Sequence, residues 1–243
     1  GLWNRKGLNC ISSYEASLIY GEVKDQTTFA PNIAKTHNPK IIGDKAIKDL
    51  VTSYNLLKKF GIYICVNLSC PNTAGGKTFE NPESLRDLIS ALKKEGKVRP
   101  VIFKFSPSLS RKELEELVKV SYDFADGYEA VNTRPYENGK YGKGGRSGPS
   151  LRHEALGTVK ALREIAPDKV IIGCGGISTG KDLYNMNKEG ANGGGLVYTG
   201  FVYKHPANPY AGPGFAHKVL EEYEKIIALD EIAAGMRGAE NGR

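Results

Sequence analysis

The sequence predicts an α/β fold on a parallel sheet, because short apolar runs alternate with amphipathic segments along its 243 residues. Polar residues cluster just after the apolar runs, and 40% apolar content is enough for a sizeable core. The runs of strand length are Phe29–Ile33, Ile62–Leu68, Pro100–Phe105, Gly127–Val131, Val170–Gly173 and Gly195–Tyr198.

Six βα units exceed a small flavodoxin-like sheet but fall short of the eight that a closed barrel needs. We therefore expect a TIM-type (β/α)8 barrel, of which about six βα units lie in this chain. No linker is visible, so residues 1–243 are expected to form a single domain. The first residue is Gly, which suggests that the start of the natural chain is absent.

The segments between the runs have helical signals in chain order. Apolar residues recur at helical spacing from Ile47 to Leu57, and Gly61 follows as a stop signal. Asn81 can cap the next helix, which has Pro82 in its first turn.

The remaining helices are predicted by similar patterns. Ser110 and Glu113 can form a capping box before an apolar face. Further helices are expected over Ala155–Ile165, from near Thr179, and over Val219–Ile232.

Composition excludes several classes of protein. The net charge of +7 is scattered, with no basic tract of five or more, so it indicates solvated surface rather than nucleic-acid binding. No apolar run approaches the roughly 18 residues of a membrane span, and no signal peptide opens the chain, so we expect a soluble protein. The four cysteines lack metal-site spacing, which favours free thiols in a reducing compartment and predicts no metal site.

The heptapeptide from Asn67 to Thr73 is the strongest candidate for catalysis. It places Cys70 between two carboxamides, at the predicted carboxyl end of a buried strand, where α/β folds carry their chemistry. A thiol with an ordinary pKa of about 8.5 can act as a general base, and all four histidines lie outside the polar clusters. The alternative is a buried structural thiol.

Two further features indicate an anionic, phosphorylated ligand. Lys104 lies within an apolar run, where burial is costly unless the ammonium meets a negative charge or an electron-rich ligand; a structural lysine is the alternative. The glycines of residues 173–176 precede a helix and can expose N–H groups to a phosphate, as can Tyr198 and Thr199 after the last run. The glycine-rich segment Glu137–Ser150 is interpreted as a mobile flap or a plain surface loop.

Taken together, these motifs resemble the flavin-binding barrel of dihydroorotate dehydrogenase, from about Asn4 to about Tyr203. The motifs that agree in order and spacing are residues 4–9 (NRKGLN), 31–35 (PNIAK), 67–73 (NLSCPNT), Lys104 before Ser106-Pro107, Asn132-Thr133, 144–148 (GGRSG), 173–176 (GCGG) and Tyr198-Thr199. The family's barrel begins with two further strands, which this sequence does not contain.

The resemblance implies oxidation of dihydroorotate to orotate in pyrimidine biosynthesis, with FMN across the carboxyl ends of the strands. Cys70 would be the general base, and the flavin would take a hydride. The residues implied to bind the substrate are Asn9, Asn67, Asn72, Asn132 and Thr133. Those implied to bind FMN are Asn32, Asn67, Lys104, Asn132, Ser147, Gly148, Gly175, Gly176, Tyr198 and Thr199.

The resemblance leaves the electron acceptor open among quinone, fumarate and NAD. A Cys base is similar to the soluble class of the family, whereas the NRKGLN opening and residues 198–201 (YTGF) are similar to the membrane-associated, quinone-reducing class. The implied location is cytoplasmic or, for the quinone-reducing class, peripheral on an energy-transducing membrane through a segment absent here.

Two alternative functions stay open at the level of sequence. A tRNA dihydrouridine synthase also sets a Cys-Pro pair after a strand of a flavin barrel, but no basic stripe for RNA is visible here. A non-catalytic barrel fragment that binds flavin or phosphate would retain the cofactor without reducing it.

Overall fold

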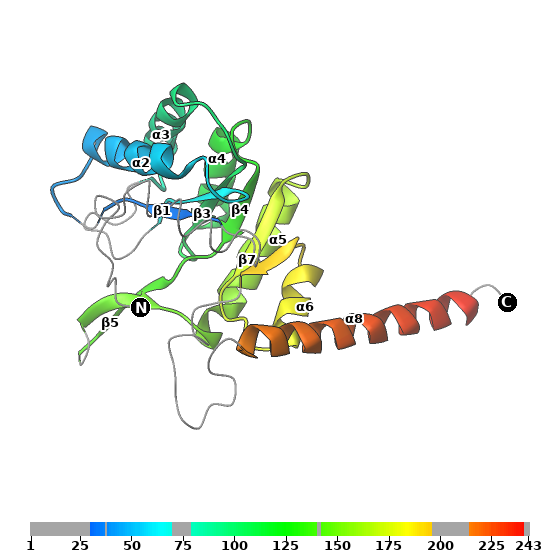
Figure 1. The fold of residues 1–243 in the computed structure, drawn as a ribbon. Coiled ribbons are helices and arrows are strands. Elements are labelled where there is room, and N and C mark those ends of the chain that lie inside the picture. The colour runs from blue at the N-terminus through cyan, green and yellow to red at the C-terminus, as the bar shows by residue number, and fades with distance from the viewer. Residues whose placement is uncertain (1–29, 37, 70–78, 140–141, 196–213, 241–243) are drawn as a thin grey trace.

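A six-stranded parallel sheet forms the centre of the protein. The computed structural model describes residues 30–36, 38–69, 79–139, 142–195 and 214–240 (Figure 1). The sheet order is β1-β2-β3-β4-β7-β8, with bounds Asn32–Ala34, Ile64–Asn67, Val101–Phe105, Gly127–Ala130, Val170–Cys174 and Gly193–Gly195. Each strand pairs with its sequence neighbour in this sheet, as successive βα units of a barrel do.

The helices that connect these strands are those that the sequence predicts. They are α2 (Asp44–Leu57), α3 (Pro82–Lys94), α4 (Arg111–Ser121), α5 (Arg152–Ile165) and α6 (Gly180–Lys188). Asn81 caps α3 by accepting from two backbone N–H groups, and the capping box of Ser110 and Glu113 starts α4. Each cap satisfies N–H groups that have no partner within the helix and stabilises it by about 1 kcal/mol.

The two faces of the sheet differ in chemistry. Along β3, Val101, Phe103 and Phe105 belong to the apolar core that the strands share with the helices. The alternating residues Ile102 and Lys104 point to the opposite face, because side chains alternate along a strand. That second face therefore corresponds to the interior of a barrel.

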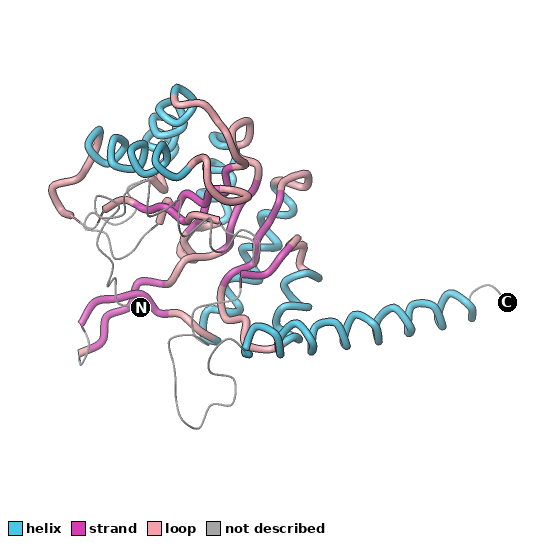
Figure 2. Tube along the Cα trace, viewed as in Figure 1, coloured by secondary structure: helices cyan, strands magenta, loops and turns pink. Residues whose placement is uncertain are grey.

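The segment after β4 differs from the sequence expectation. Part of the segment Glu137–Ser150, expected to be a mobile flap or a plain surface loop, belongs to an antiparallel hairpin of β5 (Arg134–Asn138) and β6 (Gly142–Arg146), which stands apart from the main sheet (Figure 2). No strand signal is visible for β6 because it is mostly glycine, which has low β-propensity. Backbone hydrogen bonds to β5 supply the pairing in its place.

The last strand and helix also shift relative to the predictions. The predicted run Gly195–Tyr198 shares only Gly195 with β8, and residues 196–198 lie outside the described residues. Helix α8 runs from Gly214 to Glu240, beyond the predicted segment on both sides. It packs on α6 and then extends past the rest of the described structure (Figure 1). In the described part of the chain, no helix is long and apolar enough to cross a membrane.

Candidate active site

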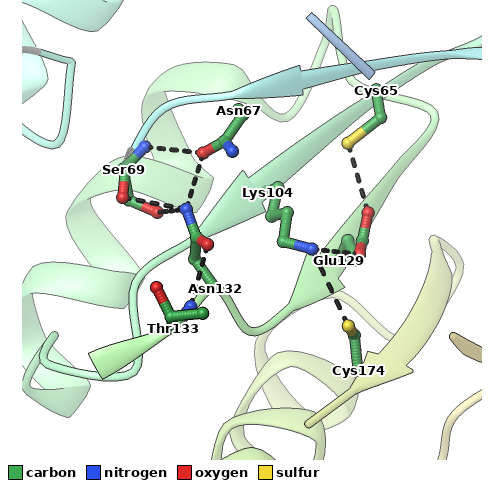
Figure 3. Close-up of polar contacts among 8 residues, drawn as sticks. All are labelled: Cys65, Asn67, Ser69, Lys104, Glu129, Asn132, Thr133 and Cys174. Carbon is green, nitrogen blue, oxygen red and sulfur yellow. Dashed lines mark hydrogen bonds and ion pairs between the residues drawn. The ribbon is translucent and has the colours of Figure 1, made fainter. Parts of the chain in front are cut away.

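The carboxyl ends of the strands bring three polar side chains into one row on the inner face of the sheet. Asn67 on β2 is the register partner of Lys104 on β3, and Lys104 is the partner of Glu129 on β4. Register partners in a sheet point to the same face, so these side chains lie side by side (Figure 3). The row is where a barrel places its chemistry.

A carboxamide cluster occupies one end of this row. The Asn132 Nδ2 donates to Asn67 Oδ1 at 3.0 Å and to the Ser69 carbonyl at 2.9 Å. The Ser69 N–H donates to the same Asn67 oxygen at 3.2 Å, and the Thr133 N–H donates to Asn132 Oδ1 at 2.8 Å. The amide group of Asn67 has no acceptor among the described residues, so it can donate to a ligand. A rigid pair of carboxamides can hold the edge of a planar ring that has both donors and acceptors.

An ion pair occupies the other end. Lys104 Nζ lies 2.5 Å from Glu129 Oε1, and both side chains are only 11% exposed. The same ammonium lies 3.7 Å from Cys174 Sγ, and Cys65 Sγ lies 3.2 Å from the second carboxylate oxygen. Burial lowers the pKa of Lys104, but Cys174 and Glu129 beside it outweigh that effect, so the pKa lies above its ordinary value.

The two described cysteines are free thiols within this cluster. Burial raises the pKa of Cys65 well above its usual range, and Glu129 adds to the shift. Burial also raises the pKa of Cys174, although Lys104 opposes it. Both side chains therefore remain protonated at neutral pH, which makes neither of them a base.

A glycine turn follows β7 and packs against the start of α5. Gly175 and Gly176 are buried and have φ values of 133° and 73°. A Cβ on Gly176 would lie 2.8 Å from the backbone nitrogen of Arg152. Gly148, with φ of 84°, immediately precedes the short 3-10 helix Pro149–Leu151 that leads into α5. The turn can present backbone N–H groups to an anion.

Asp182 on α6 holds this turn in place. Its carboxylate accepts from the backbone N–H of Ser178 and of Thr179, both at 3.0 Å. Arg152 closes the arrangement, since its Nε lies 2.8 Å from Asp182 Oδ1 and also donates to the Gly176 carbonyl at 3.1 Å. The expected helix near Thr179 is thus confirmed, with a capping box formed by Thr179 and Asp182.

The remaining predicted residues are not part of one contiguous group. Asn32 on β1 is the register partner of Cys65, which lies two positions before Asn67 on β2. Ser147 and Gly148 follow β6 and precede the 3-10 helix Pro149–Leu151. The predicted residues Asn9, Cys70, Asn72, Tyr198 and Thr199 lie outside the described residues.

The sequence reasoning missed Glu129. Like Lys104, it interrupts an apolar run, Gly127–Val131, and that interruption was the available signal. A buried lysine requires a countercharge, and an acidic residue within the adjacent predicted strand is its natural source.

The described residues form part of an α/β barrel with carboxamides, a buried cation and a glycine turn at its strand ends, which is where barrel enzymes carry their chemistry. The sequence profile of the dihydroorotate dehydrogenase family matches residues 1–227. A quinone-type dihydroorotate dehydrogenase of Thermus thermophilus is 32% identical over 96% of this chain and 67% of its own length. One from Mycobacterium tuberculosis is 31% identical over 83% of this chain and 58% of its own length.

Solved structures agree on the fold. The structure of DHODH from Eimeria tenella in complex with ferulenol has a TM-score of 0.80 to this chain at 24% identity, covering 95% of this chain and 67% of its own. The chain belongs to the dihydroorotate dehydrogenase family. It spans about 58% of the length of the mycobacterial relatives. Its fold is part of a TIM-type barrel, as the sequence predicts. The family assignment favours a dihydroorotate dehydrogenase over the alternative of a tRNA dihydrouridine synthase.

Proposed function

We propose that this protein oxidises dihydroorotate to orotate with FMN, as a step of pyrimidine biosynthesis. The observation that carries the proposal is the carboxamide cluster of Asn67 and Asn132 beside the buried Lys104, at the carboxyl ends of strands in a chain of this family. Bound FMN would accept a hydride from the substrate ring, and the protein would bind, orient and deprotonate that ring.

The carboxamides suit the substrate because a dihydropyrimidine ring presents alternating N–H and C=O groups. Asn67 can donate through its amide group, while Asn132 is fixed by Ser69 and by the Thr133 N–H. In this role, the cluster orients the ring and limits its rotation, which lowers the entropy cost of reaching the reactive geometry. Asn9 and Asn72 are proposed to complete the set.

The described residues also fit FMN by the chemistry of their donors. Lys104 has three N–H donors, so an ammonium that contacts Glu129 and Cys174 can still contact the electron-rich edge of a flavin. The buried turn at Gly175 and Gly176 suits a phosphate, and Gly148 lies at the start of the neighbouring helical segment. Asn32, Ser147, Tyr198 and Thr199 are proposed as further contacts.

Cys70 is proposed as the general base that removes the ring proton. It follows Ser69, whose carbonyl and hydroxyl accept hydrogen bonds from Asn132, so the residue before the base is tied to the ring-binding group. The raised pKa values of Cys65 and Cys174 argue against either of them as a rival base. Quinone is the proposed acceptor, since both bacterial relatives carry quinone in their names, and membrane association belongs to the same proposal.

Anaerobic addition of dihydroorotate to the FMN-reconstituted protein tests this function. We expect rapid loss of the visible flavin absorbance. Bound flavin that stays oxidised would point to another substrate or to a non-catalytic barrel fragment, and failure to bind FMN would refute the cofactor assignment.

Cys70→Ser tests the base. At neutral pH a serine hydroxyl is far less readily deprotonated than a thiol, so without further activation flavin reduction should slow by at least about tenfold while FMN stays bound. Cys65→Ser is the matched control, because Cys65 stays protonated and should leave the rate within a few fold of the parent. Equal rates for Cys70→Ser and the parent would remove Cys70 from the mechanism.

A further inference from the structure

The inner face of the sheet carries a charge arrangement that substrate binding does not require. Lys104 is proposed above to face the flavin, but its ammonium already contacts a full carboxylate, Glu129, at 2.5 Å. The pair lies on adjacent strands in direct register, so both side chains project from the same inner face. Lys104 therefore meets any bound flavin as half of an ion pair.

Glu129 is itself held in place. Cys65 donates its S–H to Oε2 at 3.2 Å, while Lys104 occupies Oε1, so each carboxylate oxygen has a fixed partner (Figure 3). The residue is 8% exposed, which keeps water from screening its charge. Because both oxygens of the Glu129 carboxylate have a partner, its negative charge stays beside the Lys104 ammonium.

The consequence concerns the electron affinity of the flavin. Reduction places negative charge on the isoalloxazine ring, which a nearby ammonium stabilises and a nearby carboxylate opposes. An ammonium without a countercharge would favour the reduced form strongly, whereas one paired with a carboxylate favours it less.

We propose that Glu129 is a positioning residue that fixes the Lys104 ammonium and partly cancels its charge, and thereby lowers the reduction potential of bound FMN. The inference rests on the proposed function, since it takes Lys104 to face the flavin. Its effect is to weaken the hold on reduced flavin and so to ease the passage of electrons to the acceptor.

The test is the midpoint potential of FMN bound to the protein and to variants, measured by reductive titration with a reference dye. Glu129→Gln keeps an amide oxygen for Lys104 but removes the negative charge. It should increase the preference for reduced over oxidised FMN by about tenfold, a positive shift of about 30 mV for a two-electron couple. Glu164→Gln is the matched control, because Glu164 is an exposed carboxylate paired with Arg111. The midpoint potential of FMN bound to this variant should stay at the parent value.

A double-variant comparison separates action through Lys104 from a direct effect on the flavin. A Lys104→Met background removes the ammonium through which Glu129 is proposed to act, so adding Glu129→Gln there should shift the potential by much less than it does in the parent. An equal shift in both backgrounds would overturn the role through Lys104. Glu129→Asp, which keeps the charge but shortens the side chain, should give a smaller positive shift and serves if Glu129→Gln does not fold.

The outcomes distinguish the two proposals. A potential that Glu129→Gln and Glu129→Asp leave unmoved, in protein that dihydroorotate reduces, overturns only the role of Glu129. A shifted potential in protein that dihydroorotate does not reduce upholds that role and overturns the proposed substrate. Protein that binds no FMN overturns both.

Discussion

Gly176 and Gly157 offer a sharp test of the site's packing, because the same substitution should have opposite effects at the two positions. Gly176 lies in the turn after β7 with φ of 73°, and a Cβ there would lie 2.7 Å from Arg152 Cβ and 2.8 Å from its backbone nitrogen. Gly157 lies on the exposed side of α5, and a Cβ there would meet nothing within 4 Å.

The magnitudes follow from these contacts. Alanine at Gly176 costs about 1–2 kcal/mol for the left-handed backbone and about 1–3 kcal/mol for displacing the start of α5. Gly176→Ala should therefore lower the free energy of unfolding by about 2–5 kcal/mol. Gly157 lies in a helix interior, where glycine loses more backbone entropy on folding than alanine does. Gly157→Ala should therefore raise the free energy of unfolding by about 0.5–1 kcal/mol.

Urea unfolding followed by circular dichroism measures both variants, and FMN affinity measures the site. The midpoint for Gly176→Ala should fall and FMN should bind more weakly, because displacement of the turn moves the proposed phosphate contacts. The Gly157→Ala midpoint should rise with FMN affinity unchanged. The reasoning fails if Gly176→Ala is as stable as the parent, since the backbone clash would then be absent.

Three smaller predictions concern single contacts. Asp182→Asn should lower the free energy of unfolding in urea by about 2 kcal/mol, because the side chain, only 5% exposed, loses its negative charge opposite Arg152. An unchanged urea midpoint would contradict this. Asn81→Ala should cost about 1 kcal/mol by the same assay, since α3 loses its cap, whereas Asn81→Asp should retain most of it. Asn132→Ala should weaken orotate binding at least about tenfold in a flavin spectral titration, and equal affinity would exclude Asn132 from the substrate site.

The sequence predicts the elements whose signals are local. The cap at Asn81, the capping box at Ser110 and the apolar faces of the helices appear as expected, because capping and helical periodicity act within a few residues. The five strands from β1 to β7 in the main sheet also lie within predicted apolar runs or within one residue of them. The β5–β6 hairpin was missed, since its glycines carry no side-chain pattern.

Of the candidate site, the sequence determined which residues stand at strand ends, and hence that Asn67, Lys104 and Asn132 belong to one edge of the sheet. Only the tertiary structure decided their partners. Register between adjacent strands sets Glu129 against Lys104, and packing between α5 and α6 sets Arg152 against Asp182. Such contacts join residues 25 and 30 positions apart, and their energies depend on burial and distance, neither of which a linear pattern of residue types contains.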